Sequence, residues 1–293
     1  MDPLLVVFGF GVGILVGTTG MGGGSLMTPL LILLFGIKPV IAVGTDLAYA
    51  AITKTAGGLL HWRRGTVQKD LALWLAVGSC PGAVAGVILL DRLGLNDLLL
   101  PLISAALLLT GALVLLRALW LQGAGEMETV PMTRGHKVAA VVLGGSVGFV
   151  LGVTSAGSGT LIAVGIILFF KLSPRRVVGT DVFHAALLLW TAAIAHLFSG
   201  NVDLVLAGTI LIGSLPGVWV GTHLATRLPE RGLRPALGIV LLTSGLTLLT
   251  KAGVDVPVGI IVAVPLVLAA LAALLLRNRA HRRASPVPVP SKS

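Results

Sequence analysis

The chain contains 293 residues, of which 56% are hydrophobic and only 11% are charged, and its mean hydropathy is +1.02. A soluble domain needs a polar surface, so this composition excludes one and predicts an integral membrane protein. The formal net charge is +10, but the Lys and Arg residues lie in short loops, mostly on alternate sides of the predicted spans. That is the pattern of the positive-inside rule, and it gives no reason to expect a nucleic-acid partner.

Apolar segments recur along the first half of the chain. The stretch 4–19 follows Met1-Asp2-Pro3, which lacks the basic residues of a signal peptide, so we expect it to stay in the mature protein. After a glycine-rich break, a short helix at 25–36 reaches about 18 Å and cannot cross a hydrocarbon core of about 30 Å. We therefore predict a broken or re-entrant pair whose tip lies at membrane depth. Three longer helices complete this half, at 40–61, 70–90 and 97–118.

The second half repeats this order and adds one helix. Its predicted elements are an apolar stretch, a break, a short helix, three longer helices and an additional helix, at 138–153, 154–160, 160–171, 176–197, 203–225, 232–250 and 256–276. The predicted fold class is all-α, a polytopic membrane protein. It divides into a first transmembrane repeat, a cytoplasmic linker, a second transmembrane repeat, an additional transmembrane helix and a basic, disordered cytoplasmic tail, at 1–120, 121–137, 138–252, 253–276 and 277–293.

A shift of 135 residues aligns the two halves without a gap. It places Gly13 on Gly148 and carries the run Gly44-Thr45-Asp46 onto Gly179-Thr180-Asp181. Identities that keep one register over such a length indicate an internal duplication.

The number of crossings predicts how the two copies lie relative to each other. If the broken pair enters and leaves on one side, each copy crosses the membrane three times, and an odd number inverts the second copy. A cytoplasmic C-terminus leaves only Lys38, Arg92 and Lys251 among the loop cations on the outer side. The sequence therefore predicts inverted-topology repeats, which in transporters place the substrate site at the membrane midplane.

Each glycine-rich break immediately precedes a short helix. The first backbone N–H groups of a helix lack partners and carry partial positive charge, and glycine lets a ligand approach them, so each break is a candidate anion site. The alternative is that the glycines only allow close helix packing. The predicted substrate-binding residues are Thr19, Gly22, Gly23, Gly24 and Ser25 in the first break, Thr154, Ser155, Gly157, Ser158, Gly159 and Thr160 in the second, and Thr45 and Thr180.

Two carboxylates follow Gly-Thr in long apolar helices. An ionised carboxylate near the bilayer centre costs at least about 2.5 kcal/mol. Asp46 and Asp181 are therefore candidates for coupling to a proton or sodium ion if they lie inside the helices. If they lie at the helix ends, they are N-caps, and the sequence leaves both hypotheses open.

The other coupling candidates are one lysine and three histidines. Lys54 lies mid-helix, and three interpretations are open: it snorkels, pairs with Asp46 or attracts the anion. His184 is one turn beyond Asp181, and His61 and His196 end equivalent helices. These imidazoles are candidates for proton relays, with solvation at the membrane interface as the alternative for the two terminal histidines.

Several motifs of the two copies form one combined pattern. They are the glycine run with Pro29-Leu30-Leu31, Gly44-Thr45-Asp46-Leu47, His61-Trp62-Arg63-Arg64-Gly65-Thr66-Val67, Pro81-Gly82, and, in the second copy, Gly179-Thr180-Asp181 and the run from His196 to Asp203. Together these motifs resemble the TauE/SafE sulfite exporter family. The resemblance covers about residues 8–250 and implies a permease for sulfite, sulfonates such as sulfoacetate or sulfolactate, or related small anions in a prokaryotic inner membrane.

The resulting prediction is a secondary transporter that binds a small anion between the two breaks and works by alternating access. The alternatives are an anion channel and an intramembrane serine hydrolase that uses Ser158 with His184 or His196. We predict no enzyme activity, catalytic residue, metal or cofactor, and the single Cys80 excludes an intramolecular disulfide. The partners are the anion, the lipid bilayer and a candidate co-transported proton or sodium ion, and the sequence leaves the oligomeric state open.

Overall fold

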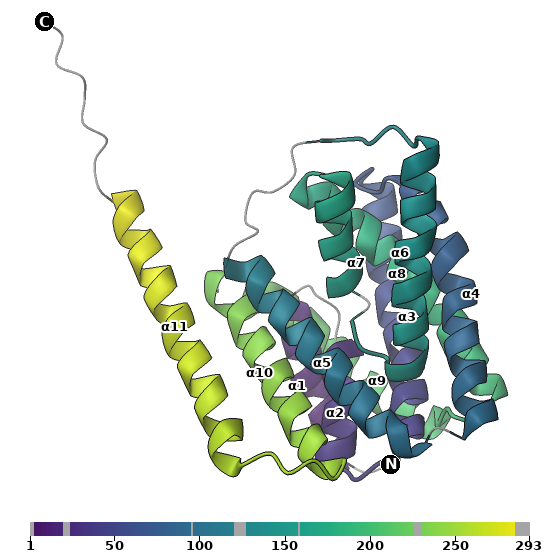
Figure 1. Cartoon of the computed structure of the whole chain (residues 1–293), viewed down its shortest axis with the longest axis vertical. Helices are drawn as coiled ribbons and strands as arrows, with labels where there is room; N and C mark the ends of the chain where they lie inside the picture. Colours follow the sequence, from purple (N-terminus) through teal and green to yellow (C-terminus); the bar gives the residue numbers. More distant parts are fainter. Residues whose placement is uncertain are drawn as a thin grey trace, which may run out of the picture.

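The computed structural model describes residues 3–19, 24–94, 96–119, 127–157, 159–225 and 230–284. These residues form helices and one isolated β-bridge, between Met127 and Leu172, which confirms the all-α fold class (Figure 1). The first copy contains α1 (Pro3–Thr19), α2 (Gly24–Leu34), α3 (Pro39–Arg63), α4 (Lys69–Leu93) and α5 (Asn96–Leu119). The second contains α6 (Arg134–Thr154), α7 (Thr160–Gly165) with the π-helical turn η1 (Ile166–Phe170), α8 (Pro174–Phe198), α9 (Leu204–Ala225) and α10 (Glu230–Lys251), and α11 (Val258–Ala284) follows.

The predicted elements all occur, and one boundary was wrong. Helix α11 continues to Ala284, so the beginning of the predicted disordered tail is helical. In this part of the chain apolar and basic residues of good helix propensity continue without a glycine or proline that would end the helix.

Five helices are long and apolar enough to cross a membrane, namely Lys69–Leu93, Asp97–Ala118, Arg134–Thr154, Pro174–Phe198 and Leu204–Leu224. The chain is therefore a multi-pass membrane protein. Helix α3 has 25 residues but is not one of these five, and it buries Asp46 and Lys54 in the interior.

Four helix pairs form the body of the molecule. Helix α1 packs along α9 and α4 along α6, while α3 packs against α8 and α5 against α10. The α1–α9 and α4–α6 pairs approach so closely that a Cβ added at Gly13 would come closer than 3.0 Å to the backbone of Ser214. A Cβ at Gly148 would meet the backbone of Ser79 in the same way. The 135-residue shift converts one contact into the other, so the duplication extends to the packing.

Equivalent helices of the two copies run antiparallel. On α3, Thr55 lies against Trp190 of α8, whereas Gly58, further along, lies against Phe183. Helices α5 and α10 are also antiparallel, since Gly111 lies against Gly238, whereas Gly245, further along α10, lies against the earlier Ser104 of α5. The short pairs differ in place accordingly: Figure 1 shows α1–α2 in the lower part of the molecule and α7 beside α6 in the upper part.

Helix α11 lies at the edge of the molecule, where it packs on α10 (Figure 1). Its described side chains include exposed Val258, Val262 and Leu266. An apolar helix of this kind is suited to contact lipid.

Candidate functional site

The Gly-Thr pair at the start of α3 holds a loop of the other copy. A Cβ at Gly44 would collide with the carbonyl oxygen of Asn201, so only glycine lets the loop come this close. The Thr45 hydroxyl then accepts a hydrogen bond of 3.1 Å from the backbone N–H of Asp203. Gly200, which precedes Asn201 in this loop, has a φ of 73°, a conformation that favours glycine.

The second copy repeats this arrangement. Gly179 lies against Thr66, and the Thr180 hydroxyl accepts a hydrogen bond of 3.0 Å from the backbone N–H of Gln68. Thr45 of α3 thus binds the loop before α9, and Thr180 of α8 binds the loop before α4, so each hydrogen bond joins the two copies. Their role in substrate binding stays a prediction.

The aspartates that follow lie well inside their helices. Helix α3 begins at Pro39 and α8 at Pro174, so Asp46 and Asp181 are about two turns beyond the helix starts. Their exposed fractions are 0% and 6%. The N-cap hypothesis was therefore wrong for both, because a cap must precede the first helical turn.

Asp46 joins three parts of the chain. Its Oδ2 accepts hydrogen bonds from the Thr28 hydroxyl on α2, at 2.7 Å, and from the Ser155 hydroxyl in the second break. The two hydroxyl oxygens are 3.0 Å apart. Asp46 Oδ1 is buried and has no hydrogen-bond partner among the described residues. We call Thr28, Asp46 and Ser155 the junction cluster, because it links the first copy to the break of the second.

The second break turns sharply beside this cluster. Ser155 and Gly157 have φ angles of 59° and 94°, a conformation that favours glycine at the second position. The N–H of Ser155 donates to the Leu151 carbonyl, and the N–H of Ala156 donates to the Thr154 hydroxyl. Two of the predicted donors to an anion are therefore occupied within the chain.

Helix α7 begins directly after this turn. Gly159 is its N-cap residue and provides no side-chain cap, and Thr160, the first helical residue, is buried. A Cβ at Gly157 would approach the side chains of Leu161 and Thr110. Gly157 thus has both a turn conformation that favours glycine and side chains close to its Cα, and its role in substrate binding stays a prediction.

Part of the predicted site lies outside the described residues. This applies to Gly22, Gly23 and Ser158, and to the side chains of Thr19 and Ser25 at the ends of α1 and α2. Gly24 is the first residue of α2. The structure therefore describes the second break and leaves the first as a prediction.

Asp181 is surrounded differently from Asp46. It interacts electrostatically with Lys54 of α3, which is 6% exposed, although the two side chains form no hydrogen bond or ion pair with each other. Pairing of Lys54 with Asp46 and snorkelling to the membrane surface were therefore wrong. The antiparallel packing of α3 and α8 brings Lys54 to the carboxylate of the other copy.

The three histidines that are coupling candidates lie in separate environments. His184 is buried, and its Nε2 lies 2.8 Å from the Ser79 hydroxyl on α4. His196 is also buried and its Nε2 lies 2.7 Å from the Gly152 carbonyl, so its solvation was predicted wrongly. His61 is partly buried, with Nδ1 2.9 Å from the Thr66 hydroxyl. Each ring contacts a neighbouring helix or loop, and the structure does not join them into one chain.

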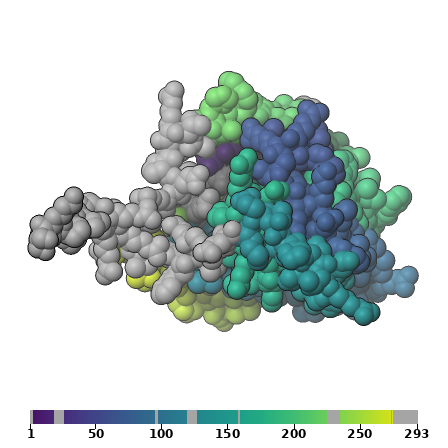
Figure 2. Space-filling view, turned by 90° about the horizontal axis from the view of Figure 1, so that it is seen from above, coloured from purple at the N-terminus to yellow at the C-terminus, as the bar shows by residue number. Residues whose placement is uncertain are grey.

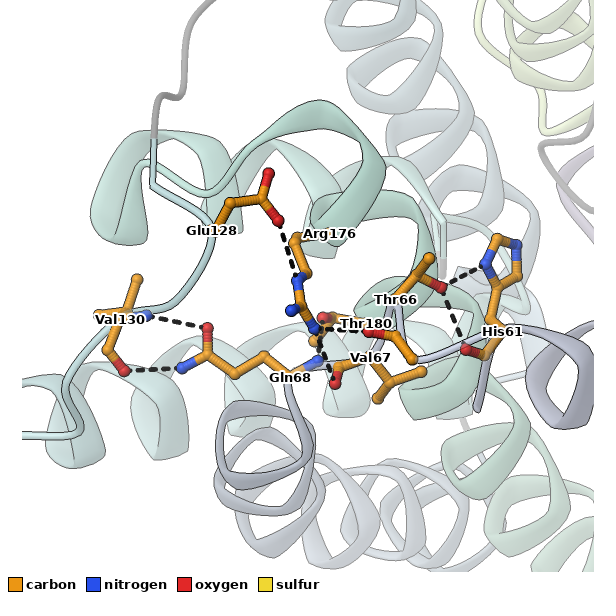
Figure 3. A network of polar contacts seen from close by, with 9 residues as sticks. His61, Thr66, Val67, Gln68, Glu128, Val130, Arg176 and Thr180 are labelled. Carbon is orange, nitrogen blue, oxygen red and sulfur yellow. Dashed lines mark hydrogen bonds and ion pairs between the residues drawn. The ribbon is translucent and has the colours of Figure 1, made fainter. Parts of the chain in front are cut away.

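A polar network at the upper end of the molecule was missed by the sequence analysis (Figure 3). Arg176 donates to the carbonyl of Gly65 at 2.8 Å and forms an ion pair of 3.3 Å with Glu128. The Gln68 side chain forms two hydrogen bonds with the backbone of Val130. The described end of the linker thus lies beside the α3–α4 loop. Figure 2, which views the molecule from above, shows blue and teal segments of the chain side by side on this face.

Two further residues were missed in the membrane interior. The sequence analysis did not single out Thr28, whose counterpart is Ala163, or Tyr49, whose counterpart is His184. A search for polar residues in apolar helices, without regard to the repeat, would have found both. Among the described residues, no group of three or more His, Cys, Asp and Glu side chains is placed to hold a metal ion.

Comparison with known proteins gives a consistent result. The model of the family described as sulfite exporter TauE/SafE matches residues 5–248. The chain is 38% identical over 255 residues to the "Probable membrane transporter protein YjnA" of Bacillus subtilis, with 85% of this chain and 100% of the relative covered. It is 31% identical to the "Probable membrane transporter protein YdhB" of the same organism, with 84% and 99% covered. No solved structure matches the chain.

Proposed function

The chain belongs to the sulfite exporter TauE/SafE family of membrane transporters, and on that premise we propose that it is a secondary transporter for a small anion, sulfite or an organosulfonate. The observation that carries this proposal is the junction cluster. There the break of one copy meets buried polar side chains of the other. A polar contact between two repeats is where a transporter of this design binds its substrate.

The proposed topology is a pair of inverted repeats, with the C-terminus in the cytoplasm. The antiparallel packing of α3 with α8 and of α5 with α10 supports it, since helices that span a membrane in opposite directions belong to oppositely oriented copies. Alternating access then arises when one copy rocks against the other about this contact.

In the proposed site, the anion lies at the start of α7 and at its counterpart in the first copy. The backbone N–H groups of Gly159 and Thr160 are the donors, because this helix start has no side-chain cap. The hydroxyl of Thr160 and, once it turns away from Asp46, that of Ser155 complete the second-copy half, and the first-copy half is made by the equivalent break. An anion held by backbone dipoles needs no buried cation, which reduces the cost of its release.

Counterflow in proteoliposomes tests the proposal. Purified protein is reconstituted, loaded with unlabelled sulfite, an organosulfonate or a carboxylate, and exposed to the labelled anion outside. We expect saturable, trans-stimulated uptake of sulfite or the organosulfonate. Flux that never saturates would instead indicate a channel, and hydrolysis that is abolished by Ser158→Ala in a folded protein would indicate the enzyme alternative.

A substitution at the second break tests the site itself. Gly157→Val adds bulk where a Cβ would approach Leu161 and Thr110, and we expect it to reduce counterflow at least tenfold while membrane expression persists. Gly253→Val is the matched control, because Gly253 has a similar φ of 89° but open space around it. Equal activity of the two variants would contradict the proposed site.

A further inference from the structure

Asp46 is buried, and no described side chain provides a counter-charge to it. Its hydrogen-bond partners are the hydroxyls of Thr28 and Ser155, and the ionisable neighbour on its own helix is Tyr49, one turn away. The other charged groups of this region interact elsewhere: Lys54 with Asp181, and His196 with the Gly152 carbonyl. In the described part of the chain, hydroxyls rather than a cation surround this carboxylate.

The position of Asp46 conflicts with the binding of an anion unless its charge is removed. Ser155 belongs to the break at which the anion is proposed to dock, and its hydroxyl contacts Asp46 directly. Two negative charges in adjacent positions repel strongly away from bulk water, because the effective dielectric constant there is low. Protonation of the carboxylate removes this repulsion and creates an O–H donor.

We propose that Asp46 takes up one proton when the anion binds, so that proton and anion cross the membrane together. The proton binds at Oδ1, the oxygen that has no partner among the described residues, and leaves from there to the water on the other side. No covalent bond changes other than this O–H bond. The inference rests on the proposed transport function and names the coupling ion of the same site.

The geometry favours a proton over a sodium ion. The oxygens of the junction cluster lie 2.5, 2.7 and 3.0 Å apart, which are hydrogen-bond distances, and both hydroxyls donate to Oδ2. A metal cation needs acceptor oxygens turned toward it and enough space to be surrounded by them. Hydroxyls that donate to the carboxylate leave no such space between these three oxygens.

The second copy contributes no further proton in this scheme. Asp181 differs from Asp46 in that Lys54 acts on it electrostatically, and the scheme assigns Asp181 no proton. The expected stoichiometry is therefore one proton per anion, and a monovalent anion crosses without net charge.

Proton movement is measured with the full chain in proteoliposomes that contain a pH-sensitive dye. Methanesulfonate is the decisive probe, because it has a permanent single charge and brings no proton of its own, and labelled sulfite is the second probe. We expect the lumen to acidify in step with uptake, with equal amounts of proton and anion. Uptake should not change when a potassium diffusion potential is imposed or when sodium is replaced by choline.

Variants separate the role of Asp46 from folding. Asp46→Asn should abolish acidification in protein that still purifies as a folded species. Thr28→Val removes one donor to the charged carboxylate, so the pH of half-maximal uptake should move upward by about half a unit or more. Thr209→Val is the matched control, since this buried threonine donates only to the Val205 carbonyl of its own helix, and its pH profile should stay at that of the wild type.

The outcomes distinguish this inference from the proposed function. Saturable counterflow without proton movement, or with sodium dependence, overturns the inference and leaves anion transport intact. Absence of counterflow for both probes overturns the proposed function and the inference with it. If sulfite alone is transported, an unchanged pH profile in Thr28→Val overturns the inference.

Discussion

Asp46 and Asp181 occupy equivalent positions in the two copies, yet their surroundings have little in common. Asp46 receives hydrogen bonds from Thr28 and Ser155, whereas Asp181 faces the Lys54 ammonium. The counterparts of Thr28 and Lys54 are the apolar Ala163 and Leu189, so neither environment can form in the other copy. Both copies have the carboxylate, but the groups that surround it differ.

The helix packing, in contrast to the surroundings of the two aspartates, is the same in both copies. Gly13 and Gly148 each lie against the backbone of an equivalent serine, and Thr45 and Thr180 each accept a hydrogen bond from an equivalent loop. Where two helices touch through their backbones, only glycine fits at the contact, because any added Cβ collides with the partner helix. A buried charge can be stabilised by a cation or by hydroxyl donors, so the two copies could differ without loss of the fold.

The largest effect is expected at the lysine that distinguishes the two copies. Lys54→Leu copies the residue of the second repeat and leaves Asp181 buried without its counter-charge, so the free energy of unfolding should fall by about 3 kcal/mol. Lys54→Leu with Asp181→Leu should recover most of this loss. Thermal unfolding in detergent measures both, and a double variant no more stable than the single one would contradict the pairing.

The next effect tests whether the packing of the copies is equivalent. Gly148→Ala and Gly13→Ala should each lower the free energy of unfolding by about 2 to 3 kcal/mol, since the new methyl group meets backbone that cannot move aside. Gly208→Ala is the control, because no atom lies within 4 Å of its added Cβ. The same unfolding assay applies. A large difference between the first two variants would show that one contact is looser than the other.

A smaller effect is expected at the threonines that hold the loops. Thr45→Val and Thr180→Val each leave a backbone N–H of the other copy without its acceptor, and each should cost about 1 kcal/mol of stability. Hydrogen exchange of the Asp203 and Gln68 amides reports the same change locally. Slow exchange in the variants would mean that the hydrogen bonds contribute little.

The sequence predicted most of the fold because the signals for it are local. Apolar length, glycine position and the 135-residue shift located each helix, and the short length of 25–36 identified the broken pair. The end of α11 was misjudged because a basic run is compatible with either helix or disorder.

The site was harder to predict because its partners come from both copies. Asp46 was singled out from the sequence, but its link to Ser155 depends on how the second hairpin packs beside α2 and α3. For Lys54 the sequence left three interpretations open and none of them named Asp181, because sequence spacing measures distance along one helix, whereas Asp181 lies on the antiparallel α8.

The smallest effect on stability is expected at Arg176, a charged residue of the second copy that binds the α3–α4 loop and has no charged counterpart in the first copy. Arg176 donates to the carbonyls of Gly65 and Val67, but its counterpart is Ile41, and the equivalent loop at 199–203 is held without an arginine. Because Arg176 is partly exposed and Glu128 mostly so, Arg176→Ile should lower the free energy of unfolding by less than about 1 kcal/mol. Thermal unfolding at low and high salt measures this. A loss as large as that of Lys54→Leu would mean that the α3–α4 loop depends on Arg176, although the equivalent loop at 199–203 is held without an arginine. The two copies would then differ at this end of the molecule as much as they do at the buried carboxylates.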